Sequence, residues 1–440
     1  MKRRKLKKSF KLLLLLFVLF IVSVLFLLNF MKNDNEKTDK EDEEIEKIDY
    51  EEYVISKLSS YEDKEFLKWI CDNYEESIIK IYNYLESKDY DDKMWHETVG
   101  YSYKVLTDFY SNKYENMDNV RVFDKNSSTM TFVGDVSLAD NWAIIPKYDE
   151  RGKGVLGILS SEVLNELKGS DFFTLNSEFT VSERGSAMEN KQYTFRAHPK
   201  RLSIYDEMGL DLALLANNHV YDFGRDAFLD MLEHFKNANI PYIGAGKNLD
   251  EAKRAYYIVL NGYKIAFLNS TRAEKYILTP GAKEDSDGVF RCYDTTEMVE
   301  EIKKAKEESD IVISIVHFGK EFSHELEDVQ VKTAKEFIDA GSDIVVGHHA
   351  HVLQGVEFYN DKPIIYNLGN FIFNAATVDT AIFKVTVKND MNMDYEIIPC
   401  IQKDEYTYIA DNTEKQRIIN DINSWSINAY LDENGKILKK

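Results

Sequence analysis

Short apolar runs alternate with helical segments from residue 129 onward. The apolar runs are rich in Val, Ile and Phe and lie at 129–134, 172–179, 212–219, 264–271, 310–319 and 343–351. Segments with apolar residues at helical spacing lie between them, at 224–239, 296–310 and 325–341. Buried strands that alternate with amphipathic helices predict a layered α/β domain, a sheet sandwich with helices on its faces. We assign this domain to residues 126–410, and residues 411–440 to a C-terminal tail or helix.

The pattern at the start of the chain is different. Residues 12–31 carry no charge and are interrupted only by Ser23 and Asn29. A helix of this length reaches about 30 Å, the thickness of the hydrocarbon core of a bilayer. Lys and Arg dominate residues 1–11, so this basic tail is expected in the cytoplasm and the bulk of the chain outside. We predict a single-pass anchor in the cell membrane. A cleaved signal peptide is the alternative, but the run is longer than the apolar h-region of a typical signal peptide and no A-x-A-like cleavage site follows it.

Two segments join the anchor to the α/β domain. Residues 32–49 are almost wholly charged or polar, which is typical of a solvated linker. Residues 50–125 place aromatic and aliphatic residues at helical spacing and contain no Pro, which predicts a small helical module.

Charge and cysteine content narrow the function. The formal net charge is −21 although the N-terminal tail is basic, so the rest of the chain is strongly acidic. Such a surface repels nucleic acid, and we expect no nucleic-acid partner. The three cysteines are far apart and have no spacing typical of a metal site or a disulfide framework.

Polar residues stand at the ends of several apolar runs. Asp135 follows the first run, Glu178 lies at the end of the second, and Asn217, Asn218 and His219 end the third. Each alone could cap a helix or sit in a turn. Ligands bind outside the carboxyl ends of the strands in open α/β sheets, so the recurrence of the pattern predicts one shared site.

Histidines extend this set. His317 lies near the end of the fifth run, and His349 and His351 are two residues apart at the end of the sixth, where an extended chain places both on one face. Imidazole and carboxylate are the usual ligands of zinc, manganese and iron in proteins. The combined pattern therefore predicts a divalent metal ion, either Mn, Zn, Fe or Mg.

Six ordered motifs between residues 129 and 375 resemble those of the CapA family. They are "FVGDVSLAD", "NSEFTVS" followed by "YTFRAHP", "ANNHVYDFG", "HFGKEF", "AGSDIVVGHHAHVLQGVE" and "YNLGNFIF". This family comprises bacterial capsule-biosynthesis or poly-gamma-glutamate-synthesis proteins. The resemblance implies a fold similar to that of calcineurin-like metallophosphoesterases.

The resemblance also implies roles for single residues. Its implied metal ligands are Asp135, Glu178, Asn218, His317, His349 and His351. His219 corresponds to an acid or an electrostatic stabiliser of the leaving group, and we take His219, Asp135 and Glu178 as the catalytic set. The chain departs from the phosphoesterase pattern where Ser137 replaces a histidine ligand and where Glu178 replaces an aspartate. Losing a ligand weakens one site of a two-metal centre, so a single occupied site is one expectation.

Further residues are expected to support substrate and ligands. Arg196 is the expected anchor for a carboxylate of the substrate, because guanidinium pairs with carboxylate through two hydrogen bonds. Glu321 and Asp222 are expected to orient the histidines, and Asn217 and Glu321 are also candidates for substrate binding.

Two functions of different class remain open from the sequence. One is an extracytoplasmic metal-dependent hydrolase or transferase that acts on an anionic capsule polymer of the poly-gamma-glutamate type. The other is a polymer-binding subunit that performs no chemistry within a capsule synthase or export complex. Both imply the polymer and other membrane subunits as partners. An ordinary phosphoesterase is the third and weakest interpretation.

Overall fold

The computed structural model describes residues 117–121, 127–260, 262–273, 277–388 and 390–440. The chain divides into two units, Met1–Asp124 and Lys125–Lys440. The predicted basic tail, the membrane-spanning helix at 12–31, the linker and most of the helical module lie outside the described residues. The described end of the first unit contains strand β1 (Asn119–Arg121), at the end of the range predicted as helical. No helix within the described ranges is long and apolar enough to cross a membrane.

The second unit contains two main sheets, which confirms the mixed α/β prediction. The first sheet has the order β19-β18-β17-β2-β3-β6-β7, with β16 also paired to β2. Its strands are β2 (Ser127–Val136), β3 (Phe172–Ser177), β6 (Leu212–Leu214), β7 (Tyr242–Ile243), β16 (Asn370–Ile372), β17 (Val378–Lys388), β18 (Met393–Lys403) and β19 (Tyr406–Ile409). Strands β2, β3, β6 and β7 run parallel, whereas β17, β18 and β19 are antiparallel.

Within this unit the second sheet has the order β9-β10-β12-β13-β15-β14. Its strands are β9 (Tyr256–Leu260), β10 (Tyr263–Thr271), β12 (Ile311–His317), β13 (Ile344–His348), β14 (Val356–Tyr359) and β15 (Lys362–Ile365). The four central strands are parallel, and the outer two are antiparallel to their neighbours.

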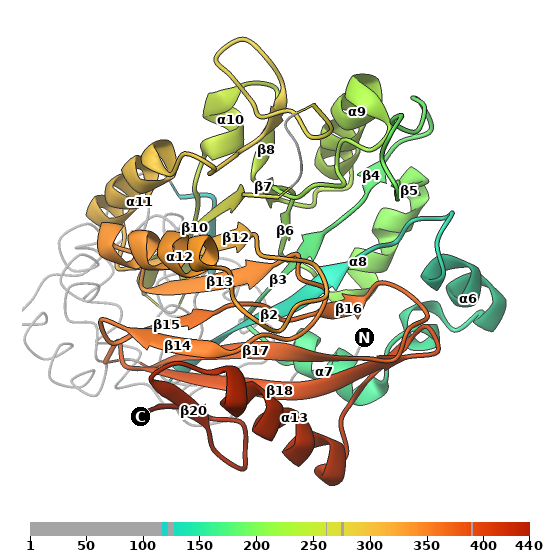
Figure 1. Cartoon of the computed structure of the whole chain (residues 1–440). Helices are drawn as coiled ribbons and strands as arrows, with labels where there is room; N and C mark the ends of the chain where they lie inside the picture. The colour runs from blue at the N-terminus through green and yellow to red at the C-terminus, as the bar shows by residue number, and fades with distance from the viewer. Residues whose placement is uncertain (1–116, 122–126, 261, 274–276, 389) are drawn as a thin grey trace, which may run out of the picture. The chain divides into compact units, whose positions relative to one another are not determined.

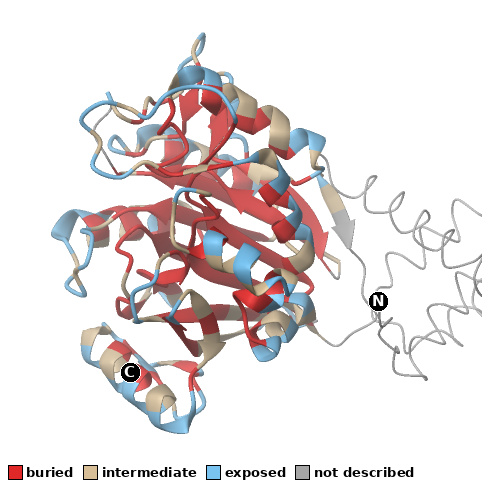
Figure 2. Cartoon of the chain, turned by 90° about the vertical axis from the view of Figure 1, so that its right-hand side faces the viewer, coloured by how far each residue is buried: buried red, intermediate tan, exposed pale blue. Residues whose placement is uncertain are grey.

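Aromatic side chains join the two sheets face to face. The ring of Phe267 from β10 lies 4.9 Å from that of Phe172 in β3 and 6.5 Å from that of Phe132 in β2. These side chains are fully buried, and Figure 2 shows the buried residues concentrated within the layers of the sheets. The main core therefore lies between the sheets and beneath their helices.

Helices cover the outer faces of the sandwich (Figure 1). Apolar residues of α11 (Thr296–Glu308) and α12 (Asp328–Ala340) pack on the second sheet. Those of α7 (Ser161–Gly169), α8 (Ser203–Met208) and α9 (Gly224–Asn237) pack on the first. The predicted helices at 224–239, 296–310 and 325–341 are thereby confirmed as α9, α11 and α12.

Short elements complete the unit. The helices are α6 (Ile144–Arg151), α10 (Leu249–Lys253), α13 (Asn412–Trp425) and the 3-10 turns η1 (Gly154–Gly157) and η2 (Pro199–Leu202). The strands form three pairs, β4 (Thr180–Val181) with β5 (Arg196–Ala197), β8 (Ala245–Gly246) with β11 (Gly288–Val289), and β20 (Ala429–Leu431) with β21 (Ile437–Lys439). Residues 411–440 belong to the same compact unit as the sheets, where they form α13 and the β20–β21 pair.

Candidate metal centre

Polar residues from the carboxyl ends of parallel strands in both sheets meet in one buried cluster. The first sheet contributes Asp135 near the end of β2 and Glu178 directly after β3. The second contributes His317 at the end of β12, and His349 and His351 just after β13. All five are buried, and each lies in hydrogen-bond or ion-pair contact with another member or a shared partner.

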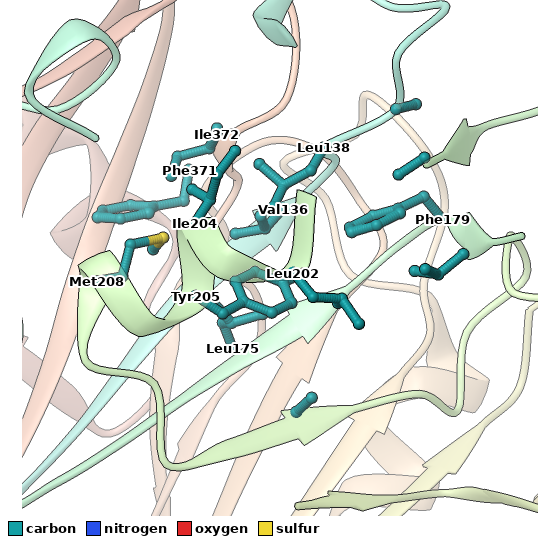
Figure 3. Packing of buried hydrophobic residues seen from close by; sticks show 14 of the residues in the cluster. Val136, Leu138, Leu175, Phe179, Leu202, Ile204, Tyr205, Met208, Phe371 and Ile372 are labelled. Carbon is teal, nitrogen blue, oxygen red and sulfur yellow. The ribbon is translucent and has the colours of Figure 1, made fainter. Parts of the chain in front are cut away.

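Strand alternation explains how Asp135 and Glu178 are held. Successive side chains of a strand point to opposite faces, so Val136 and Leu175 face away from the carboxylates. Figure 3 shows these apolar residues packed against α8, where Tyr205 lies among them. The Tyr205 hydroxyl donates to Ser177 Oγ at 2.8 Å. A close-packed apolar layer therefore fixes the strands whose other face carries the acids.

Glu178 is the centre of the cluster. Its Oε2 accepts from Asn176 Nδ2 at 3.0 Å, whereas its buried Oε1 has no hydrogen-bond partner among the described residues. Oε1 is instead surrounded by three imidazole Nε2 atoms, at 3.7 Å for His317, 3.7 Å for His351 and 3.9 Å for His219. Burial and the charge of Asp135 raise the pKa of Glu178 well above that of an ordinary glutamate. The cluster therefore surrounds a buried carboxylate oxygen that has no hydrogen-bond partner among the described residues.

Asp135 pairs with the loop that carries the histidines. Its Oδ2 accepts from the backbone N–H of His349 at 3.2 Å and lies 3.3 Å from His351 Nδ1. Burial alone would raise the pKa of Asp135, but the hydrogen bond and charge of His351 outweigh it, and the pKa is lowered. The same contact raises the pKa of His351 against the effect of burial. Asp135 and His351 therefore interact closely, and each shifts the pKa of the other.

The backbone at His349 and His351 is left-handed, with φ of 96° and 59°. Non-glycine residues rarely adopt this region, and such outliers concentrate at functional sites. The His351 Nδ1 lies 2.8 Å from Asn370 Oδ1, which leaves its Nε2 directed toward Glu178. His349 Nδ1 is buried and has no hydrogen-bond partner in the described part of the chain. Burial lowers the pKa of His349 to about 3, so its ring is neutral and able to bind a metal.

The residues present fit a divalent metal ion. Two groups of three side chains bring their ligand atoms within 4.8 Å of one another, Glu178 with His349 and His351, and Asp135 with Glu178 and His317. The first group includes the two orphaned buried atoms, Glu178 Oε1 and His349 Nδ1. Burying such atoms without a partner is costly, and a cation with nitrogen and oxygen preference would satisfy both.

A second histidine faces the cluster as part of an acid–base pair. His219 Nδ1 lies 2.7 Å from Asp222 Oδ2, which also accepts from the Phe195 backbone N–H at 2.7 Å. The other Asp222 oxygen lies 2.7 Å from the buried Lys191 ammonium. Burial lowers the pKa of His219, although the charge of Asp222 opposes this effect. Asp222 therefore orients His219, as the sequence analysis expected.

Asn218 and Asn217 make hydrogen bonds to residues of the cluster and to their neighbours. Asn218 Oδ1 is 2.7 Å from His317 Nε2, so the two predicted ligands pair with each other. Asn217 is fully buried and donates to Asn176 Oδ1 and to the Ser177 carbonyl. It also accepts from the His219 backbone N–H at 3.0 Å. Its side chain is thus used inside the protein, where it supports the site instead of facing substrate.

Arg196 and Glu321 lie in less buried surroundings. The Arg196 guanidinium stacks on the Phe223 ring at 4.3 Å and donates to the carbonyls of Arg184 and Gly185. The guanidinium is therefore held by backbone carbonyls of the segment after β4 and by the ring of Phe223. Glu321 is exposed on the turn after β12, and its charge contributes to the raised pKa values of Glu178 and His351.

Ser137 lies two residues beyond Asp135, where the phosphoesterase pattern has a histidine. Its Oγ is buried and has no hydrogen-bond partner among the residues described. The chain therefore has a short buried hydroxyl at this position instead of a ring nitrogen.

Sequence reasoning missed Asn176, Lys191 and Asn370, the last of which is the partner of His351 Nδ1. Asn176 contacts Asp135, Glu178 and His317 through its amide nitrogen. Lys191 donates to the Asn218 carbonyl and pairs with Asp222. Asn176 carries a usable signal, since a residue two positions before Glu178 in a strand shares its face. Lys191 carries none, because it lies in a polar segment whose path is set only by the tertiary fold.

Comparison with known proteins gives consistent relatives. The family model described as bacterial capsule synthesis protein PGA_cap matches residues 129–375. The PGA biosynthesis protein CapA of Bacillus subtilis strain 168 is 30% identical over 326 residues, which cover 72% of this chain and 83% of that protein. The capsule biosynthesis protein CapA of Bacillus anthracis is 29% identical over 302 residues, which cover 66% of this chain and 71% of the relative.

Solved structures are more distant. The crystal structure of a 5′-nucleotidase from Candida albicans SC5314 aligns with a TM-score of 0.32 and 13% identity, over 63% of this chain and 52% of that one. A TM-score this low does not establish a shared fold. The family match covers more than half of the chain and contains every residue of the metal cluster. The chain therefore belongs to the CapA family of bacterial capsule synthesis proteins.

Proposed function

We propose that this protein is a metal-dependent hydrolase or transferase that acts on an anionic capsule polymer of the poly-gamma-glutamate type. One observation carries the proposal of chemistry. The His219–Asp222 pair directs an imidazole nitrogen toward Glu178 Oε1, the orphaned oxygen at which a cation fits. A proton-transfer group beside a metal position is the arrangement that acyl or phosphoryl transfer requires. The names of the Bacillus relatives support the polymer as substrate.

The residues of the chain divide the chemical work. A divalent ion, when bound, supplies a Lewis acid that polarises a substrate oxygen and lowers the pKa of bound water. Glu178, His349 and His351 would hold it. Asp222 fixes the tautomer of His219 by accepting from Nδ1, so Nε2 faces the reacting groups. Neutral His219 takes up a proton there, and Asp222 stabilises the imidazolium that then returns the proton to the leaving group. Arg196 remains the proposed anchor for a polymer carboxylate.

We also propose that residues 12–31 anchor the protein in the membrane with the catalytic unit outside the cell. The uncharged run and its basic N-terminal flank support this orientation. In that position the protein would act beside other membrane subunits of the polymer synthase or exporter. Fractionation and protease treatment of intact cells test it. A catalytic unit that is found in the soluble cytoplasm, protected from external protease, would refute this localisation.

His219→Ala tests the catalytic proposal. In cells that make the polymer, we expect the variant to accumulate as folded protein and to abolish capsule polymer, because the proton-transfer group is missing. His234→Ala, on α9, is the matched control and is expected to leave polymer production unchanged. Polymer of normal amount and chain length from His219→Ala would contradict a catalytic role.

A binding subunit without chemistry is the second candidate, and Ser137 is the observation that favours it. Its buried hydroxyl stands where the phosphoesterase pattern has a metal ligand. Polymer incubated with the purified full chain and Mn²⁺ separates the two functions. Shortening or transfer of polymer chains supports the enzyme. Binding that is equal in the wild type and His219→Ala, with no change in chain length, supports the binding subunit.

A further inference from the structure

The two candidate metal-ligand groups differ in whether their ligand atoms already have hydrogen-bond partners. Both include Glu178. The group with His349 and His351 retains unpartnered atoms, Glu178 Oε1 and His349 Nδ1, within the described structure. Every member of the other group contacts a single atom, Asn176 Nδ2. The distances are 2.8 Å to Asp135 Oδ1, 3.0 Å to Glu178 Oε2 and 3.3 Å to His317 Nδ1.

Backbone groups determine which way the Asn176 amide faces. The backbone N–H of His219 can only donate, so Asn217 Oδ1 is the acceptor of that bond. Asn217 Nδ2 is then the donor to Asn176 Oδ1 at 3.1 Å and to the Ser177 carbonyl at 2.9 Å. Asn176 therefore turns its oxygen toward Asn217 and its NH₂ group toward the three acceptors.

This orientation also sets the tautomer of His317. The two hydrogen atoms of Asn176 Nδ2 serve the shorter contacts to Asp135 and Glu178, and His317 Nδ1 faces the same NH₂ group at 3.3 Å, where an unprotonated nitrogen fits better than an N–H. In the neutral ring the proton is then on Nε2, which donates to Asn218 Oδ1 at 2.7 Å. His317 and Asn218 thus provide each other with a hydrogen-bond partner, while Asn176 provides the donor for Asp135 and Glu178.

We propose that the Asn176 amide takes the place of a second cation, so that this centre binds one divalent ion, on Glu178, His349 and His351. The inference rests on the proposed function only in that both concern the same metal. The amide supplies the positive hydrogen atoms that Asp135 Oδ1 and Glu178 Oε2 need, and Asp135 Oδ2 is already paired with His351 and the His349 N–H.

Charge predicts the consequence of changing this residue. Asn176→Asp removes the NH₂ donor and places a third carboxylate beside Asp135 and Glu178. Like charges at this distance in a buried site are strongly unfavourable unless a cation lies between them. The variant is therefore expected to gain a second ion, and the wild type to bind one.

The experiment measures Mn²⁺ binding to the full chain purified in mild detergent. Calorimetric titration and elemental mass spectrometry are expected to give one ion per wild-type chain and two per Asn176→Asp chain. Electron paramagnetic resonance is expected to show an isolated Mn²⁺ signal in the wild type and an exchange-coupled pair in the variant. Asn434→Asp, on the exposed turn between β20 and β21, makes the same charge change and is expected to bind one ion.

Each possible result of this experiment supports or overturns the proposed role of Asn176. Two ions or an exchange-coupled signal in the wild type would overturn the role of Asn176 and leave the metal enzyme standing. A second ion that is absent from folded Asn176→Asp would also overturn it. If that variant does not fold, the wild-type resonance signal alone decides. No bound Mn²⁺ in the wild type would reject both this inference and the metal-dependent function.

Discussion

The two carboxylate oxygens of Glu178 have different surroundings, and this difference governs proton and metal binding at the residue scale. Oε2 accepts a hydrogen bond from Asn176, and Oε1 has imidazoles around it at 3.7 to 3.9 Å. Burial and nearby carboxylates raise the pKa of Glu178, so the metal-free protein retains a proton there at a pH where an exposed glutamate has lost it. A metal ion has to displace this proton.

Metal affinity is therefore expected to rise with pH. Glu178 holds a proton above the usual 4.5 of a glutamate, until the pH passes its raised pKa. Over that window, affinity is expected to increase about tenfold per pH unit for each proton that binding releases. Calorimetry in two buffers of different ionisation enthalpy counts these protons. An affinity that stays constant from pH 5 to pH 8 would contradict the prediction.

At the scale of elements, the close contact between β2 and the segment before β16 places Asp135. The Asp135 N–H donates to the Gly369 carbonyl at 2.8 Å. A side chain at Gly134 would bring its Cβ within 1.9 Å of that carbonyl oxygen and 2.9 Å of the Leu368 carbonyl oxygen. Both obstacles are backbone atoms, so they cannot yield as a flexible side chain does.

Gly134→Ala is accordingly expected to be severely destabilising. Separation of β2 from residues 368–369 should lower the free energy of unfolding by about 3 kcal/mol. Gly152→Ala is the control, because its Cβ would meet no atom within 4 Å and only its left-handed φ of 58° is unfavourable. The control should cost about 1–2 kcal/mol. Denaturant unfolding of both variants measures the difference, and equal losses would refute the steric explanation.

The elements that carry the site were predictable, and their pairing was not. Each strand before a site residue is a buried apolar run, so β2, β3, β12 and β13 could be located from their hydrophobicity. Such runs do not tell which strands share a sheet. The pattern therefore could not show that β2 and β3 belong to one sheet and β12 and β13 to the other.

The roles of some side chains in the site could be predicted from the sequence, and those of others could not. His349 and His351 were predictable because two histidines at a strand end have few other uses. The position of Asn176 on the strand face of Glu178 was predictable, but a single polar residue in an apolar run gives no sign of the three acceptors around it. Lys191 reaches Asp222 across 31 positions of sequence, a contact that only the folded chain creates.

At the scale of the whole molecule, the candidate metal ligands come from both sheets. Glu178 follows β3 of the first sheet, and His349 and His351 follow β13 of the second. A bound ion therefore links the two layers, in addition to the aromatic contacts between them. The ligand set does not exist in the unfolded chain, so the free energy of metal binding adds to the free energy of folding.

Metal is expected to stabilise the unit Lys125–Lys440 as a whole. Mn²⁺ at about 100 times its dissociation constant should raise the free energy of unfolding by about 2.7 kcal/mol. Glu178→Gln should abolish this gain, because the amide lacks the charge that the ion requires. Thermal unfolding with Mn²⁺ and with chelator provides the measurement. A wild type that unfolds at the same temperature in both conditions would show that the ion does not bind the folded state.

The separation of the ligands along the chain also sets when the centre can first exist. Glu178 is made long before His351, and the Asn370 partner of His351 comes later still. A ribosome that builds the chain from its N-terminus therefore releases no complete ligand set until most of the polypeptide has emerged. If the chain is threaded through the membrane as proposed, metal loading occurs after export, and the supply of ions outside the cell decides which metal the protein acquires.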